Sequence, residues 1–231
     1  EVALAFMVLA GAALLLRSFA ALVRVDPGFD ASQSLVVRLS LPGASYDTFA
    51  KRSQFFDELT RRLEATSAVT GAAVSVSLPF FADQVAAIVP EGQVVEPADR
   101  PSANFYAVSA SYFGTMGIPV LRGRGITLDD TLASRRVVVI SESLARTLFP
   151  GAADPLGRRV AISQGPSEDM SEIVGVVGDV AQYSLDASQA LLNAQMYEPA
   201  LQHPYFPVMY LVVRGESDPL ALLPAVRTVL R

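Results

Sequence analysis

The chain opens on an uninterrupted apolar run. Residues Val2 to Leu16 read VALAFMVLAGAALLL and contain no charged or strongly polar side chain. A membrane-spanning helix needs about 20 apolar residues, whereas about 10–14 are typical of a core helix or a signal peptide. The stretch SFAALV continues the apolar character beyond Arg17, whose long side chain can extend toward lipid headgroups. We therefore expect residues 1–24 to be the end of a first transmembrane helix and its exit, truncated at its start.

Two other interpretations of this run stay open. A signal peptide would explain its length, and Ser18-Phe19-Ala20 resembles a cleavage site, although no basic segment precedes the run. A helix buried in a soluble domain should carry polar residues on one face, and residues 2–16 have none. Arg17 and Arg24 follow the run, and the positive-inside tendency alone would place that side in the cytoplasm.

Residues 25–79 follow the pattern of a β-α-β unit. A turn-forming DPGFD sequence at residues 26–30 separates this unit from the apolar run. Apolar and β-branched residues predict strands over Leu35–Leu41 and Val69–Leu78. Between them, the spacing predicts an amphipathic helix from about Tyr46 to Ala65. Its apolar stripe consists of Phe49, Phe56, Leu59 and Leu63.

Residues 80–207 change to short strand-like runs separated by glycine and proline. This spacing predicts a mostly antiparallel, β-rich insertion with a single helix, Glu142–Phe149. The expected strands are Val85–Val89, Asn104–Val108, Val137–Ile140, Arg159–Ile162 and Glu172–Val177.

Residues 208–231 return to the opening pattern and form a second β-α half. Val208–Val213 reads as a buried strand, and Asp218 before Pro219 is a typical helix start. The apolar face of that helix would consist of Leu220, Leu223, Val226 and Leu230, while Pro224 should kink it or delay its start. A β-α-β unit would need one more strand after Arg231, so we expect the chain to be truncated here as well.

Charge and composition remove several classes of function. The net charge is −5 and the 18 basic residues are scattered, which argues against nucleic acid as a partner. The absence of cysteine excludes disulfides, thiolate metal sites and a cysteine nucleophile. The single histidine, His203, excludes most zinc sites and the usual Ser-His-Asp arrangements.

The remaining candidates for chemistry read as structural residues. Asp129-Asp130 and Glu168-Asp169 are adjacent pairs whose side chains diverge, so both are expected on the solvated surface. The glycines around Arg124 and before Asp179 match no dinucleotide or Walker pattern and predict turns or close packing.

No other side chain stands out as a functional group. Arg122 and Arg124 are expected to be exposed, His203 to lie in a surface loop, and no serine lies in a nucleophile elbow. We therefore predict no catalytic, cofactor-binding or metal-binding residue, no cofactor, and no enzyme activity.

Several blocks of the chain resemble one family of membrane proteins. They are LAGAALLLRSFAALVRVDPGFD (Leu9–Asp30), VSASYFGTMGIPVLRGRGIT (Val108–Thr127), VVVISESLARTLFPG (Val137–Gly151), DPLGRRV (Asp154–Val160) and EIVGVVGDV (Glu172–Val180). Their order is similar to that in the periplasmic core domain of MacB-like permeases, which belong to the FtsX/MacB group of ABC transporter subunits. The chain also resembles a subset with duplicated modules and no ATPase nearby.

This resemblance implies an α+β fold in which residues 25–79 and 208–231 form two halves of a porter-like subdomain. Residues 80–207 would be a β-rich, sabre-like insertion. The resemblance implies an inner-membrane protein whose residues after about 25 lie in the periplasm and transmit conformational change for efflux or export. The expected partners are the lipid bilayer through the N-terminal helix, an ATP-binding subunit or domain, a periplasmic adaptor and a second copy. The alternative is a membrane-anchored or secreted binding module without a transport role.

Overall fold

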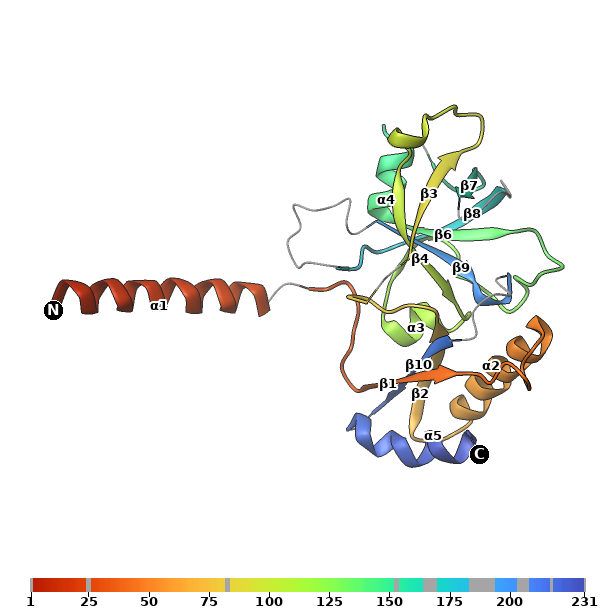
Figure 1. Ribbon diagram of the computed structural model, residues 1–231, viewed down its shortest axis with the longest axis horizontal. Helices are drawn as coiled ribbons and strands as arrows, with labels where there is room; N and C mark the ends of the chain where they lie inside the picture. Colours follow the sequence, from red (N-terminus) through yellow and green to blue (C-terminus); the bar gives the residue numbers. More distant parts are fainter. Residues whose placement is uncertain are drawn as a thin grey trace.

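The computed structural model describes residues 2–23, 26–81, 84–151, 154–163, 170–182, 194–202, 208–216 and 218–230. Ten strands form one sheet, and helices pack on both of its faces (Figure 1). The strands are β1 (Ser34–Ser40), β2 (Val69–Ser75), β3 (Val85–Pro90), β4 (Ser102–Val108), β5 (Val120–Gly123), β6 (Val137–Ser141), β7 (Arg159–Ser163), β8 (Met170–Val177), β9 (Gln195–Pro199) and β10 (Val208–Gly215). The α-helices are α1 (Val2–Val23), α2 (Phe49–Glu64), α3 (Tyr112–Met116), α4 (Glu142–Leu148) and α5 (Leu223–Val229). The short 3₁₀ turns are η1 (Pro97–Asp99), η3 (Ala200–Gln202) and η4 (Pro219–Leu222).

The N-terminal apolar run forms α1, a helix of 22 residues. All α1 side chains that the structure describes are exposed, large apolar ones such as Phe6, Leu9 and Phe19 among them. Arg17 lies within the helix and ends the uninterrupted apolar run at Leu16. Across the described residues, no helix combines the length and apolar character needed to cross a membrane. The predicted helix is present as α1, whereas the predicted membrane span is not found among the described residues.

Helix α2 forms where the apolar stripe was predicted. Thr48 caps it, since its hydroxyl accepts a hydrogen bond from the Lys51 amide at 3.4 Å. Its inward face buries Phe56, Leu59, Thr60 and Leu63. On the outward face Glu58 pairs with both Arg61 and Arg62. These exposed pairs add little stability, so the burial of the apolar face holds the helix in place.

The two predicted β-α segments meet in the same part of the sheet. Strand β10 lies between β1 and β2 and is antiparallel to both, which makes β1 and β2 parallel to each other. This arrangement is a split β-α-β unit, because the strand that fills the gap comes from the far end of the chain. Helices α2 and α5 pack against each other on one face of this part (Figure 1).

The strands between β2 and β10 close on themselves. The pairings run β4–β3, β3–β7, β7–β8, β8–β6, β6–β9 and back from β9 to β4. Closure leaves few unpaired strand edges, which protects a β-rich segment from pairing with other chains. Most of these pairings are antiparallel as predicted, but β4–β9 and β6–β8 are parallel. We call this set of six strands the closed ring.

The closed ring joins the split unit through one short contact. Only Ser75 of β2 and Val108 of β4 pair as ladder residues. Around them the Val76 amide donates to the Ala107 carbonyl at 3.0 Å, and the Ser109 amide donates to the Val74 carbonyl at 2.9 Å. The sheet is thus continuous across the predicted boundary near residue 80. The division into 1–24, 25–79, 80–207 and 208–231 stays a prediction.

Two apolar cores lie on opposite faces of the sheet. Alternate residues of a strand point to opposite faces, so Ala72 and Val74 of β2 face one core while Ala73 faces the other. The first core includes α2, α4 and the C-terminal helical segment. The second is smaller and aromatic, with Tyr106, Tyr112, Phe113 and Tyr197 in ring contact.

One α-helix and two strands were not predicted from the pattern. Helix α3 was missed because it is only five residues long and ends at Gly117, which has a φ of +68°. Strand β5 is short and fully exposed, so it has no apolar alternation. Strand β9 reads QMYEP, and its burial comes from neighbours on both edges rather than from apolar character. Pro224 does delay the last helix, because η4 precedes α5.

The aromatic core gives a matched pair of stability predictions. The buried Tyr106 hydroxyl donates to the side-chain oxygen of Gln182. The buried Tyr112 hydroxyl makes no hydrogen bond of normal geometry to the described residues, and the nearby Ser75 hydroxyl already donates to the Ser77 carbonyl at 2.5 Å. Tyr106→Phe should therefore lower the free energy of unfolding by about 1–3 kcal/mol. Tyr112→Phe should lower the free energy of unfolding by less than about 0.5 kcal/mol, or should raise it, because no hydrogen bond is lost. Urea unfolding monitored by circular dichroism measures both, and equal losses would contradict the assignment.

Candidate functional site

Residues 26–33, which precede β1 and which we call the exit segment, are fixed to the folded body. The Ala181 amide donates to the Pro27 carbonyl at 2.8 Å, and the Asp30 amide donates to the Met116 carbonyl at 2.8 Å. Gly28 has a φ of +80°, and a Cβ there would lie 2.0 Å from the Asp179 carbonyl oxygen. Only glycine allows the backbone to approach this closely. The exit segment is therefore docked on the folded body immediately before β1.

An ion pair fastens the exit segment to β10. The Arg214 guanidinium binds the Asp30 carboxylate and donates a second hydrogen bond to the Thr115 carbonyl at 3.2 Å. The same carboxylate accepts from the amide and hydroxyl of Ser32 at 2.9 and 2.5 Å. Arg214 is mostly covered, with 20% of its side chain exposed, so this pair is less screened than a surface pair. The exit segment, α3 and β10 thus converge on one charged contact.

A second set of contacts reaches α4. The Asp179 carboxylate accepts from the Ser143 amide at 2.7 Å and pairs with Arg146 at 3.1 Å. The Asp179 carbonyl also closes on Gly28 of the exit segment. Asp179, which follows β8 of the closed ring, therefore contacts both the exit segment and α4.

The predicted glycine and acidic motifs have structural roles. A Cβ at Gly175 would lie 1.9 Å from the Arg124 carbonyl oxygen, which confirms the close packing expected there. Asp129 is exposed as expected, but Asp130 is buried, which corrects the prediction for the pair. Its carboxylate forms a bidentate pair with Arg124 at 2.7 and 2.8 Å and accepts from the Thr127 amide at 2.8 Å. These donors hold the pKa of Asp130 below its usual value, although burial opposes them.

The other sequence candidates do not assemble into a site. Arg122 is exposed as expected and, unlike Arg124, has no ion pair among the described residues. Glu168-Asp169 and His203 lie outside the described residues. Ser141 caps α4 by accepting from the Leu144 amide at 3.4 Å. Within the described ranges, no three acidic or histidine side chains gather in a way that could hold a metal ion.

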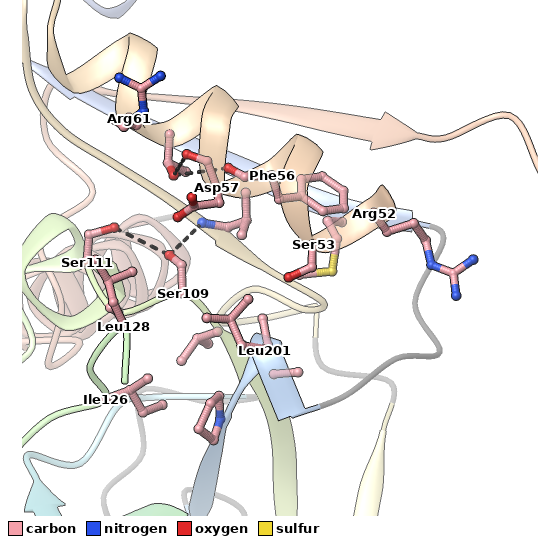
Figure 2. A pocket seen from close by; sticks show the side chains of 18 of the residues that line it. Arg52, Ser53, Phe56, Asp57, Arg61, Ser109, Ser111, Ile126, Leu128 and Leu201 are labelled. Carbon is pink, nitrogen blue, oxygen red and sulfur yellow. Dashed lines mark hydrogen bonds between the residues drawn. The ribbon is translucent and has the colours of Figure 1, made fainter. Parts of the chain in front are cut away.

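A cleft of about 280 Å³ lies between α2 and the closed ring (Figure 2). Sequence reasoning missed it, because its walls come from parts of the chain that are far apart. Its lining includes the buried apolar residues Phe56, Val74, Ala107, Ile126 and Met209. Leu128 and Leu201 flank its lower side in Figure 2.

Most of the hydroxyl groups that line this cleft form hydrogen bonds within the protein. The Ser109 hydroxyl accepts from the Val74 amide at 3.0 Å, and the Ser111 hydroxyl donates to the Ala72 carbonyl at 2.6 Å. The Thr60 hydroxyl donates to the Phe56 carbonyl at 3.0 Å. Satisfied hydroxyls present mainly carbon to a ligand, so the interior of the cleft is effectively apolar.

One buried carboxyl group titrates near neutrality. Glu198 of β9 is 3% exposed, and burial raises its pKa to about 7, although Ser171 and Arg136 oppose the shift. The Ser171 hydroxyl lies 3.3 Å from its carboxylate. Glu198 lies inside the closed ring and not in the cleft, so its protonation affects the stability of the ring.

Two solved structures share this fold. The crystal structure of the periplasmic region of MacB from Actinobacillus actinomycetemcomitans matches 88% of this chain and 84% of that chain, with a TM-score of 0.57 and 19% identity. The extracellular domain of the noncanonic ABC-type transporter YknZ from Gram-positive bacteria matches 84% of this chain and 88% of that chain, with a TM-score of 0.52 and 17% identity. At these identities the likeness shows the fold alone, which is that of an extracytoplasmic domain of ABC-type transporters.

Residues 2–229 match the MacB-like periplasmic core domain, and the chain belongs to this family. The predicted resemblance and the mixed α and β fold are thereby confirmed. A curated relative, the macrolide export ATP-binding/permease protein MacB of Aggregatibacter actinomycetemcomitans, is 36% identical over 78 residues, or 34% of this chain. The match spans 11% of that relative's length. Membership in the family implies an extracytoplasmic location.

The contacts at the exit segment were only partly visible in the sequence. The DPGFD turn includes Gly28 and Asp30, and its glycine signalled a special backbone conformation. Nothing along the chain linked Asp30 to Arg214, because the two residues are 184 positions apart. A buried position for Asp130 could have been suspected from the nearby Arg124, which offers a bidentate partner.

Glu198 should make the stability of the domain depend on pH. Its pKa is higher in the folded state than the ordinary value of 4.5, so the folded state binds more protons and stability falls as pH rises from about 4.5 to about 7. The loss should reach about 3 kcal/mol at most. Thermal unfolding from pH 4 to pH 8 should show this decline in the native protein. Glu198→Gln cannot ionise and should remove most of the decline; an unchanged profile in that variant would contradict the assignment.

Proposed function

We propose that this chain is the extracytoplasmic domain of an ABC-type permease and that it transmits conformational change between the membrane and the periplasm. The observation that carries the proposal is the docked exit segment, where the Asp30–Arg214 pair joins the route from α1 to β10. We propose that a displacement of the membrane segment reaches the sheet through residues 26–33, which are bound to β10 and α3. Family membership and the shared fold support the same role.

The energy for this motion would come from outside the domain. We propose that an ATP-binding subunit or domain drives the motion, that the permease works as a homodimer, and that a periplasmic adaptor receives it. The exposed apolar side chains of α1 would lie against lipid. Efflux or export is the transport process that this arrangement fits.

A membrane-anchored binding module is the second candidate function. The apolar cleft between α2 and the closed ring favours it, because such a cleft can bind a ligand without any coupled motion. The two functions differ in one respect: only the permease requires the exit segment to respond to nucleotide.

Loss of the Asp30–Arg214 pair should uncouple the domain. In the full-length permease assembled with its ATP-binding subunit or domain in nanodiscs, a non-hydrolysable ATP analogue should change hydrogen exchange in residues 26–33 and in β10. Asp30→Ala should reduce that change by about half or more, because the exit segment then loses its ion pair with Arg214 of β10. The pair is partly exposed, so folding stability should fall by only about 1 kcal/mol.

Asp47→Ala is the matched control, since Asp47 forms an exposed pair with Lys51 on α2, away from the exit segment. It should respond to the analogue like the native protein. If Asp30→Ala responds like the native protein as well, the proposed coupling route is wrong. If the native protein shows no response at all, the binding-module function is favoured.

Two cysteine variants test the periplasmic location. The chain has no cysteine, so each variant carries a single thiol in this domain. Val94 is 99% exposed and Val138, which does not line the cleft, is 0% exposed. In intact cells that produce the full-length protein, an impermeant maleimide should label Val94→Cys and leave Val138→Cys unlabelled. Labelling of Val94→Cys only after lysis would refute the periplasmic location, and labelling of both variants would indicate unfolding.

A further inference from the structure

The cleft between α2 and the closed ring has the shape of a small-molecule site. Its volume is about 280 Å³. A cavity of about 150 Å³ in another protein holds benzene, so this cleft has room for a body of two fused rings or a branched aliphatic group. The part of its lining formed by Phe56, Val74, Ala107 and Met209 is apolar and buried before any ligand arrives. Little reorganisation is needed to receive such a body, which favours binding.

The charged side chains that line the cleft differ in whether other residues of the protein already bind them. Four charged residues of α2 line the cleft: Arg52, Asp57, Arg61 and Glu64. The two arginines are engaged, since Arg52 donates to the Tyr46 carbonyl at 3.0 Å and Arg61 binds Glu58. Figure 2 shows both guanidinium groups directed away from the cleft.

Asp57 is oriented differently. In Figure 2 its carboxylate lies below α2, on the side of Ser109 and Ser111, and therefore faces the opening. It forms no ion pair within 4 Å among the described residues, and Arg61, four residues further along α2, interacts with its charge only at longer range. Glu64, seven residues or about two helical turns further along α2, lines the same cleft. The site thus combines an apolar interior with acceptor groups of negative charge at its mouth.

We propose that this cleft is a binding site for small amphipathic amines. The aromatic or branched aliphatic body would occupy the apolar interior, and the ammonium group would lie beside the Asp57 carboxylate. An anion would be repelled at the same position, and a neutral molecule would gain only the apolar contacts. This assignment goes beyond the coupling role and does not depend on it, because none of the cleft residues belongs to the exit segment.

Three naphthalene compounds that share the naphthylmethyl body and differ in the charge of the attached polar group test the assignment. They are 1-naphthylmethylamine, 1-naphthalenemethanol and 1-naphthylacetic acid. The readout is the ¹³C-methyl signal of Met209, measured on the full chain in nanodiscs of zwitterionic lipid. Met209 lines the cleft, and the other four methionines do not, so their signals report partition into lipid or non-specific binding. The amine should shift the Met209 signal saturably, the alcohol should bind about threefold to fivefold more weakly, and the acid more weakly still.

Two pairs of variants test the negative charge of Asp57 and the free volume of the cleft separately. Asp57→Asn should weaken the amine about threefold to fivefold, to the level of the alcohol, while Asp99→Asn on η1 should not change its binding. Ser53→Leu places a larger side chain on the wall of the cleft and should weaken all three compounds by about tenfold or more. Gln54→Leu, at the next position of α2 and outside this cleft, should bind like the native protein. Asp30→Ala should also bind normally, which keeps this test apart from that of coupling.

Four results would overturn the proposal. If the Met209 signal does not respond to the amine, the amine does not bind in the cleft. Equal binding of amine and acid, or of amine and alcohol, would remove the role of Asp57 and indicate a purely apolar occupant such as a protein side chain. Unchanged binding in Ser53→Leu would place the amine elsewhere. A Met209 signal that instead shifts with protein concentration would mean that a second copy of the chain fills the cleft.

Discussion

The placement of β10 between β1 and β2 governs the rest of the structure. Strands β1 and β2 are joined by α2 and run parallel, but they do not pair with each other. The gap between them is filled by a strand from the end of the chain, which bonds to β1 on one edge and to β2 on the other. Everything between β2 and β10 must therefore leave this part of the sheet and return to it. The closed ring satisfies that requirement, because β4 pairs with β2 and the last pairing of the ring, between β9 and β4, returns to the same strand.

The same placement explains why the exit segment and the cleft are where they are. Arg214 lies near the end of β10, opposite the first residue of β1. It therefore reaches Asp30, which precedes β1 in the chain. On the other face, α2 covers the split unit, and the closed ring starts at its flank. The cleft occupies the junction of the two, where only one residue pair continues the strand ladder. A coupling contact and a ligand site can therefore coexist without sharing residues.

Much of the secondary structure could be predicted from the sequence, because local periodicity determines it. Helix α2 and strands β1, β2 and β10 have apolar patterns that burial on one or both faces imposes. Strand β9 could not be predicted, since its polar residues Gln195 and Glu198 are buried through tertiary contacts. The candidate site was less predictable still. A pair such as Asp30 and Arg214 leaves no signal in a single sequence, and the satisfied serines of the cleft look like ordinary surface serines until their partners are known.

The split unit also has a consequence for how the chain reaches its native state. Within this domain β1 and β2 come early in the sequence, but β10, the strand that pairs with both, follows all the other strands. Contacts between residues so distant in sequence form slowly, because a long loop must close before they stabilise anything. Until then two apolar strands expose unpaired edges, and such intermediates aggregate readily. The domain should therefore depend on holdase chaperones during biogenesis more than a domain of equal size built from local β-hairpins.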